Sequence, residues 1–181
     1  MKISRPLITA LPSAVTSLRF IGLPFLVGYI RKEEYLFALG LFLALALTDF
    51  FDGVVARKFN AHSRFGKFLD PAADKFLLLP TLFYAMRPKF IFSFLFLAYY
   101  EAMLFLAACI AFTWPGNPFV KLGANWFGKA KAVSEIVLIA LFLLARLGAE
   151  ISQPVFDLLF FSAIIMAFLS VCGHINWKSW W

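Results

Sequence analysis

Apolar runs of about twenty residues recur along the whole chain, separated by short polar turns, and they restrict the fold more than any other feature. Of the 181 residues, 62% are hydrophobic and 15% are charged, which is outside the usual composition of soluble domains. A helix needs about 20 apolar residues to cross a bilayer. We therefore expect an all-α integral membrane protein, a single domain over residues 1–181 with room for six transmembrane helices.

The polar turns and helix breakers indicate where each span begins and ends. The first eleven residues carry two basic side chains and are too short to span, so they predict a short interfacial helix at the membrane surface. The six spans are predicted at residues 12–30, 34–56, 68–86, 89–113, 128–147 and 154–172. In the third span, Asp70-Pro71 either caps the helix or places a proline inside a helix that began earlier.

The basic residues are distributed unevenly between the turns. An even number of spans puts both termini on one side of the membrane, and most of the 17 Lys and Arg residues fall on that side. The positive-inside rule makes this side cytoplasmic, and in a bacterium the membrane would be the inner one. We interpret the net charge of +7 as topology and contact with anionic membrane lipids. No basic tail supports binding to nucleic acid.

Four aspartates interrupt the second and third apolar segments, and ionisable groups at such depths indicate functional sites. At 100° per residue, Asp49 and Asp52 share one stripe of a helix, while Asp70 and Asp74 lie one turn apart on another. Two facing helices would bring the four carboxylates together, close to the cytoplasmic face. Oxygen-only ligands of high negative charge suit Mg²⁺ or Mn²⁺. The alternative is a buried ion-pair network with Arg19, Arg57, Arg64, Lys67 and Lys75.

Small residues share the stripe of the first two aspartates. Gly53 and Ala56 leave that face without bulk, so that a flat or phosphorylated ligand can lie against the helix backbone. Arg19 lies roughly 10 Å along the first span, at 1.5 Å per residue. A cation at this depth can snorkel towards the headgroups, but the carboxylate cluster favours an inward orientation.

The segment from Asp49 to Asp74 resembles the signature of the CDP-alcohol phosphotransferases, also called CDP-alcohol phosphatidyltransferases. Their pattern is D-x2-D-G-x2-A-R-x8-G-x3-D-x3-D, and every fixed position matches. The resemblance implies that the signature lies on the second and third of six membrane helices and binds two Mg²⁺ or Mn²⁺ ions. It also implies that Asp49, Asp52 and Asp70 are metal ligands, and that Asp74 is the general base and a shared ligand.

The resemblance further implies a set of contacts to the CDP part of a CDP-linked lipid. Residues 12–19 resemble the P-N-x-[LV]-T-x-x-R segment of the nucleotide pocket, with Ser13 in place of the usual Asn. Arg57 can bind the diphosphate through its two-pronged guanidinium. The implied CDP-lipid contacts are Ser13, Thr16, Arg19, Gly53, Ala56, Arg57 and Ser63.

A second stretch indicates the acceptor alcohol. Residues 127–132, Phe-Gly-Lys-Ala-Lys-Ala, resemble the G-K-x-K-[TA] segment of phosphatidylglycerophosphate synthases, a branch of this family. Lys129 and Lys131 would suit an acceptor that carries a phosphate, and Glu101 would pair with one of them or orient the acceptor. That branch usually has Arg-Glu where this chain has Tyr100-Glu101. We interpret Glu135, Asp157, His62 and His174 as interfacial polar residues.

The expected function is therefore transfer of a phosphatidyl group from CDP-diacylglycerol to an alcohol, glycerol 3-phosphate by preference, with release of CMP during phospholipid biosynthesis. Inositol phosphate, or phosphatidylglycerol as in a cardiolipin synthase, stays open as the acceptor. The resemblance also implies a homodimer. A divalent-cation transporter is the alternative from another class; it explains the carboxylates but not Gly53, Ala56 and Arg57 at their spacing, and the second half lacks an inverted repeat of the motif.

Overall fold

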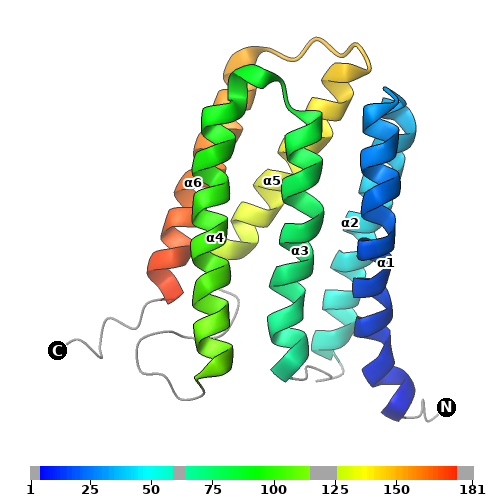
Figure 1. The fold of residues 1–181 in the computed structure, drawn as a ribbon, viewed down its shortest axis with the longest axis vertical. Coiled ribbons are helices and arrows are strands. Elements are labelled where there is room, and N and C mark those ends of the chain that lie inside the picture. Colours follow the sequence, from blue (N-terminus) through cyan, green and yellow to red (C-terminus); the bar gives the residue numbers. More distant parts are fainter. Residues whose placement is uncertain (1–4, 59–63, 115–125, 175–181) are drawn as a thin grey trace. The chain divides into compact units, whose positions relative to one another are not determined.

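The computed structural model describes residues 5–58, 64–114 and 126–174, and in these residues it is helical throughout, without strands (Figure 1). Long apolar segments form helices because a helix satisfies every backbone hydrogen bond within one segment. The elements are α1 (Arg5–Arg31), α2 (Tyr35–Lys58), α3 (Arg64–Ala85), the 3₁₀ helix η1 (Pro88–Phe90), α4 (Ile91–Thr113), α5 (Trp126–Arg146) and α6 (Gln153–His174).

The six α-helices coincide with the six predicted spans to within a few residues, except at two starts. The helix α1 runs unbroken from Arg5, so residues 5–11 are its first turns, and the separate interfacial helix predicted at residues 1–11 is not confirmed. The helix α3 begins at Arg64. Asp70 therefore does not cap α3, and Pro71 lies inside a helix that began earlier.

Two segments in the described part of the chain are long and apolar enough to cross a membrane. They are Pro88–Ile110, which covers η1 and most of α4, and Gln153–Gly173, which forms most of α6. Both lie after α3, within residues 88–173. The six-span arrangement thus stays a prediction, although the all-helical class is confirmed.

The helices form two compact units, residues 1–84 and 85–181. In the first unit, α1 packs against α2. On α2, Ala38, Phe42 and Leu45 recur at helical spacing and are buried, and on α1 the buried partners include Leu26 and Ile30. These side chains form one apolar stripe on each helix, and the two stripes are the surfaces through which α1 and α2 pack.

A glycine sets how closely α1 and α2 approach. A Cβ atom at Gly22 would lie 2.8 Å from Cδ1 of Leu45, so only a residue without a side chain fits there unless Leu45 moves. Helix α3 is joined to α1 by a ring contact, because the centroids of Phe20 and Phe76 are 5.3 Å apart.

In the second unit, α4 and α5 both pack against α6, and an aromatic cluster forms its core. The cluster joins Phe90 of η1, Phe142 of α5, and Phe156 and Phe160 of α6; the rings of Phe142 and Phe156 are stacked with centroids 4.4 Å apart. All four side chains are buried. Aromatic pairs of this kind contribute about 0.5–1.5 kcal/mol each beyond their buried area.

The helices α1 and α5 end in the same backbone motif, which fixes the turns that follow. After α1, the N–H of Glu34 donates to the carbonyl of Tyr29 at 2.9 Å, with Glu33 in the left-handed region at φ 63°. After α5, Gly148 takes this position at φ 99°, and the next residue donates to the carbonyl of Leu144 at 3.1 Å. Glycine adopts such a φ at no steric cost, whereas Glu33 does so under mild strain.

Candidate functional site

The aspartate signature lies on α2 and α3, as the sequence predicts. Helix α2 is continuous through Asp49 and Asp52, and α3 is continuous through Asp70 and Asp74, so each pair of backbone positions is one helical turn apart. The side chains of residues 49–74 lie outside the described part of the structure, as do those of Ser13 and Thr16 and the whole of Ser63. The roles of these residues stay predictions.

The donor set of the signature fits a hard divalent cation. All four residues offer carboxylate oxygens, and a spacing of three or four residues on a helix keeps the members of each pair on one face. Among the described residues, no group of three or more His, Cys, Asp or Glu side chains is placed to hold a metal. The metal role of the aspartates of α2 and α3 stays a prediction from their donor chemistry and spacing.

Arg19 is buried in the first unit, with 5% of its surface exposed. It shares one face of α1 with Gly22, Leu26 and Ile30, the face that packs against α2. The prediction that Arg19 points into the protein instead of snorkelling to the headgroups is confirmed. Its predicted contact with the CDP lipid stays a prediction.

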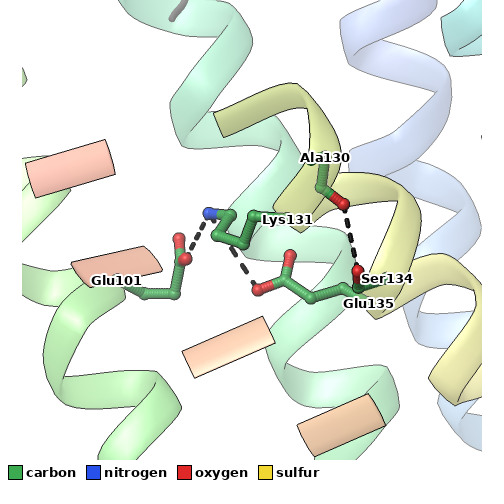
Figure 2. A network of polar contacts seen from close by, with 5 residues as sticks. All are labelled: Glu101, Ala130, Lys131, Ser134 and Glu135. Atoms are coloured by element: carbon green, nitrogen blue, oxygen red, sulfur yellow. Dashed lines mark hydrogen bonds and ion pairs between the residues drawn. The ribbon is translucent and has the colours of Figure 1, made fainter. Parts of the chain in front are cut away.

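The second unit contains a buried cluster of three charged side chains, the acid–lysine triad of Glu101, Lys131 and Glu135 (Figure 2). The Nζ atom of Lys131, on α5, makes an ion pair with Oε1 of Glu101 on α4. The same Nζ atom lies 4.0 Å from Oε1 of Glu135, which is one turn further along α5. The exposed fractions are 2% for Glu101, 8% for Lys131 and 3% for Glu135.

The local sequence explains why these charges are inside. The buried positions of α5 include Lys131, Glu135, Leu138 and Phe142, which follow one another at intervals of four, three and four residues. They therefore form a single stripe. Its first turn is ionic and its later turns are apolar.

The two lysines predicted at the acceptor site lie on different sides of α5. Two residues correspond to 200° on a helix, and Lys129 is exposed whereas Lys131 is buried. Of the two partners that the sequence leaves open for Glu101, the structure selects Lys131. The two lysines therefore have different surroundings, although both can still contribute to acceptor binding.

Glu135 is the residue that the sequence interpretation missed. It was assigned to the membrane interface, but its side chain is buried beside Lys131. The signal that could have found it is its spacing: it is four residues from a candidate site lysine and on the stripe that continues through Leu138 and Phe142. Asp157 of α6, by contrast, is exposed.

Comparison with known proteins matches residues 9–175 to the CDP-alcohol phosphatidyltransferase family. The CDP-diacylglycerol--glycerol-3-phosphate 3-phosphatidyltransferase of Aquifex aeolicus (strain VF5) is 44% identical over 78 residues, 41% of this chain and 44% of that protein. The Escherichia coli (strain K12) protein of the same name is 46% identical over 71 residues, 38% of this chain and 39% of that protein.

A relative with a different name is similar to this chain as well. The cardiolipin synthase (CMP-forming) of Oryza sativa subsp. japonica is 40% identical over 80 residues, 42% of this chain and 24% of that protein. The chain thus spans less than half the length of each of these relatives. The family match, however, extends over nearly all of the chain, so the chain belongs to the CDP-alcohol phosphatidyltransferase family.

Proposed function

We propose that this protein transfers a phosphatidyl group from CDP-diacylglycerol to an alcohol acceptor and releases CMP. The observation that carries the proposal is the family match over residues 9–175, with the complete aspartate signature placed on the continuous helices α2 and α3. Neither a structural ion-pair network nor a transporter needs the small residues Gly53 and Ala56 at their fixed distances from the aspartates.

The reaction is a displacement at phosphorus. The acceptor's hydroxyl oxygen forms a bond to the phosphorus that bears the diacylglycerol, the bond from this phosphorus to the oxygen of CMP breaks, and CMP leaves with the bonding electron pair. The carboxylate of Asp74 takes the proton of the hydroxyl group. Asp49, Asp52 and Asp70 would hold two divalent cations, with Asp74 as a shared ligand. When bound, these cations stabilise the attacking and leaving oxygens.

The CDP lipid lies along the stripe beside the first two aspartates. Gly53 and Ala56 give it room against the backbone of α2, and Arg57 binds the diphosphate in a bidentate manner. Arg19 supports this assignment, because its burial puts a cation on the face of α1 that packs against α2. Ser13, Thr16 and Ser63 complete the contacts.

Glycerol 3-phosphate is the acceptor that we propose first. Relatives from Aquifex aeolicus and Escherichia coli that are 44% and 46% identical over their matched segments carry it in their names. Lys129 and Lys131, with Glu101, are the proposed acceptor contacts. Phosphatidylglycerol is the second candidate, because the cardiolipin synthase of Oryza sativa is 40% identical over 80 residues. Inositol phosphate is a third.

Membrane association is indicated by the two membrane-length helices and by the family. We further propose six spans with both termini and the active site on the cytoplasmic side, where CMP, a water-soluble product, can leave. A homodimer, as the family resemblance implies, is part of the same proposal.

The test is CMP release by the purified, detergent-solubilised protein given CDP-diacylglycerol and Mg²⁺. Glycerol 3-phosphate, inositol phosphate and phosphatidylglycerol are supplied separately, and the lipid product is identified for each. We expect turnover that requires one of these acceptors and that stops in excess EDTA. A matched control is Asp157→Asn, which removes an exposed carboxylate outside the signature and should leave turnover unchanged.

Two results would contradict the proposal. Undiminished turnover in excess EDTA would remove the metal assignment. Divalent-cation flux into proteoliposomes, without CMP release under any acceptor, would replace the transferase by a transporter.

A further inference from the structure

Glu135 has no role in the reaction as written above, yet it lies in the buried acid–lysine triad. Its side chain is 3% exposed, and its Oε1 atom is 4.0 Å from Nζ of Lys131. The pair of Lys131 with Glu101 already joins α5 to α4. The second carboxylate therefore calls for an explanation of its own.

The two carboxylates hold the lysine in different ways. Glu101 belongs to α4, so its contact with Lys131 depends on how α4 and α5 are placed. Glu135 belongs to α5 itself and lies one turn after Lys131, which is the spacing at which side chains on a helix are neighbours. Its attraction for the ammonium group is therefore kept if the α4 contact loosens.

The ammonium group of Lys131 also lies at different distances from the two carboxylates. Lys131 contacts Glu101 directly, whereas 4.0 Å to Glu135 is beyond the length of a hydrogen bond. At that distance Glu135 stabilises the positive charge by Coulomb attraction in a buried site without using an N–H donor of the ammonium group. A lysine that must bind an anion needs its charge retained and its donors directed at the ligand, and Glu135 is placed to serve both needs.

We propose that Glu135 is a positioning residue for acceptor binding: it holds the ammonium group of Lys131 charged and in place on α5 for an acceptor that carries a phosphate. This inference rests on the proposed function, in which Lys131 contacts the acceptor. Glu135 acts through Lys131 and does not touch the acceptor. Its removal affects the step in which the anionic acceptor binds and leaves the binding of CDP-diacylglycerol alone.

The test compares Glu135→Gln with the wild-type protein, with both substrates varied. The amide keeps the shape and removes the charge, and the ion pair of Lys131 with Glu101 stays, so the variant should fold. We expect KM for glycerol 3-phosphate to rise about tenfold, with kcat and KM for CDP-diacylglycerol within about twofold, because a lost charge contact costs about this factor. Glu135→Asp should recover part of the loss.

A second measurement and a control separate positioning from a structural role. Inorganic phosphate, tested as a competitor of glycerol 3-phosphate, should inhibit Glu135→Gln about tenfold more weakly than wild type. Ser134→Ala changes the neighbouring residue, whose hydroxyl donates to the carbonyl of Ala130 at 3.1 Å, and should change neither constant.

The outcomes distinguish this inference from the proposed function. If wild type transfers the phosphatidyl group to glycerol 3-phosphate but Glu135→Gln has an unchanged KM for it, Glu135 is not a positioning residue. A loss shared equally by both substrates, with a lowered Tm, would likewise overturn the inference in favour of a structural role. Wild type that releases no CMP with any acceptor would overturn the proposed function itself.

Discussion

Replacing Lys131 by methionine tests whether the acid–lysine triad is as buried as the structure has it. Methionine has nearly the length of lysine but no charge, so the variant leaves Glu101 and Glu135 without the ammonium group that contacts them. Breaking a buried ion pair by removing one partner costs about 3–5 kcal/mol. An exposed pair would cost only about 0–1 kcal/mol, and the exposed fractions of 8% for Lys131 and 2% for Glu101 select the larger value.

This free energy converts to a measurable shift in Tm. For chains of this size, 1 kcal/mol moves Tm by about 2–4 °C, so Lys131→Met should lower Tm by roughly 6–20 °C. The triple variant Glu101→Leu/Lys131→Met/Glu135→Leu should regain much of the loss, because apolar residues of similar volume often replace a buried ionic cluster at little cost when all of its members are replaced. Tm is followed in detergent by tryptophan fluorescence at one fixed scan rate, since membrane proteins commonly unfold irreversibly.

Lys129→Met is the matched control. Lys129 is on the same helix two residues earlier, but it is exposed, and surface substitutions usually stay within about 0.5 kcal/mol. Its Tm should therefore fall within about 2 °C of wild type. Equal Tm values for Lys131→Met, Lys129→Met and wild type would refute the burial of the triad and, with it, the reasoning that separates the two lysines.

Three further predictions concern the first unit. Asp74→Asn should lower kcat by about 10²–10⁴-fold, the usual contribution of a general base, with binding of CDP-diacylglycerol retained; near-normal turnover would place the base elsewhere. Gly53→Leu should weaken binding of CDP-diacylglycerol about 10- to 100-fold through overpacking, whereas Gly40→Leu on the same helix, with open space around it, should not. If both variants bound the lipid as tightly as wild type, the stripe of Gly53 and Ala56 would not be the binding surface. Gly22→Ala should give a lower Tm than Gly28→Ala, because only the Cβ atom at Gly22 meets a neighbour, at 2.8 Å, and the reverse order would contradict the close packing of α1 on α2.

The helices could be predicted from the sequence because membrane-length apolar runs leave few alternatives. The start of the first helix could not. The sequence predicts that the first span begins at Pro12, yet α1 continues through Pro12 from Arg5 to Arg31. Proline removes one backbone donor but keeps a φ compatible with a helix, and the other turns of this 27-residue helix keep their hydrogen bonds.

In the candidate site, too, some features could be predicted from the sequence and others could not. The spacing of the aspartates could be read directly, since it depends on one helix at a time. The partner of Glu101 could not be chosen between Lys129 and Lys131, because that choice depends on which face of α5 turns towards α4. Glu135 was missed for a related reason: its charge predicted the interface, although its position on the stripe of Leu138 predicted burial. In this helix the periodicity was the better guide.

The triad also bears on the choice between a structural and a functional interpretation of the second unit. The aromatic cluster around Phe142 already provides an apolar core between η1, α5 and α6, and three buried charges add little to it, because desolvation offsets most of their mutual attraction. Helix packing alone would be served as well by leucine or methionine at these positions. Because buried charges contribute little to packing, their presence here favours a site that binds a charged ligand. Under the proposed function, an anionic acceptor would bind beside Lys131, and the two carboxylates would hold its ammonium group in place until that acceptor binds.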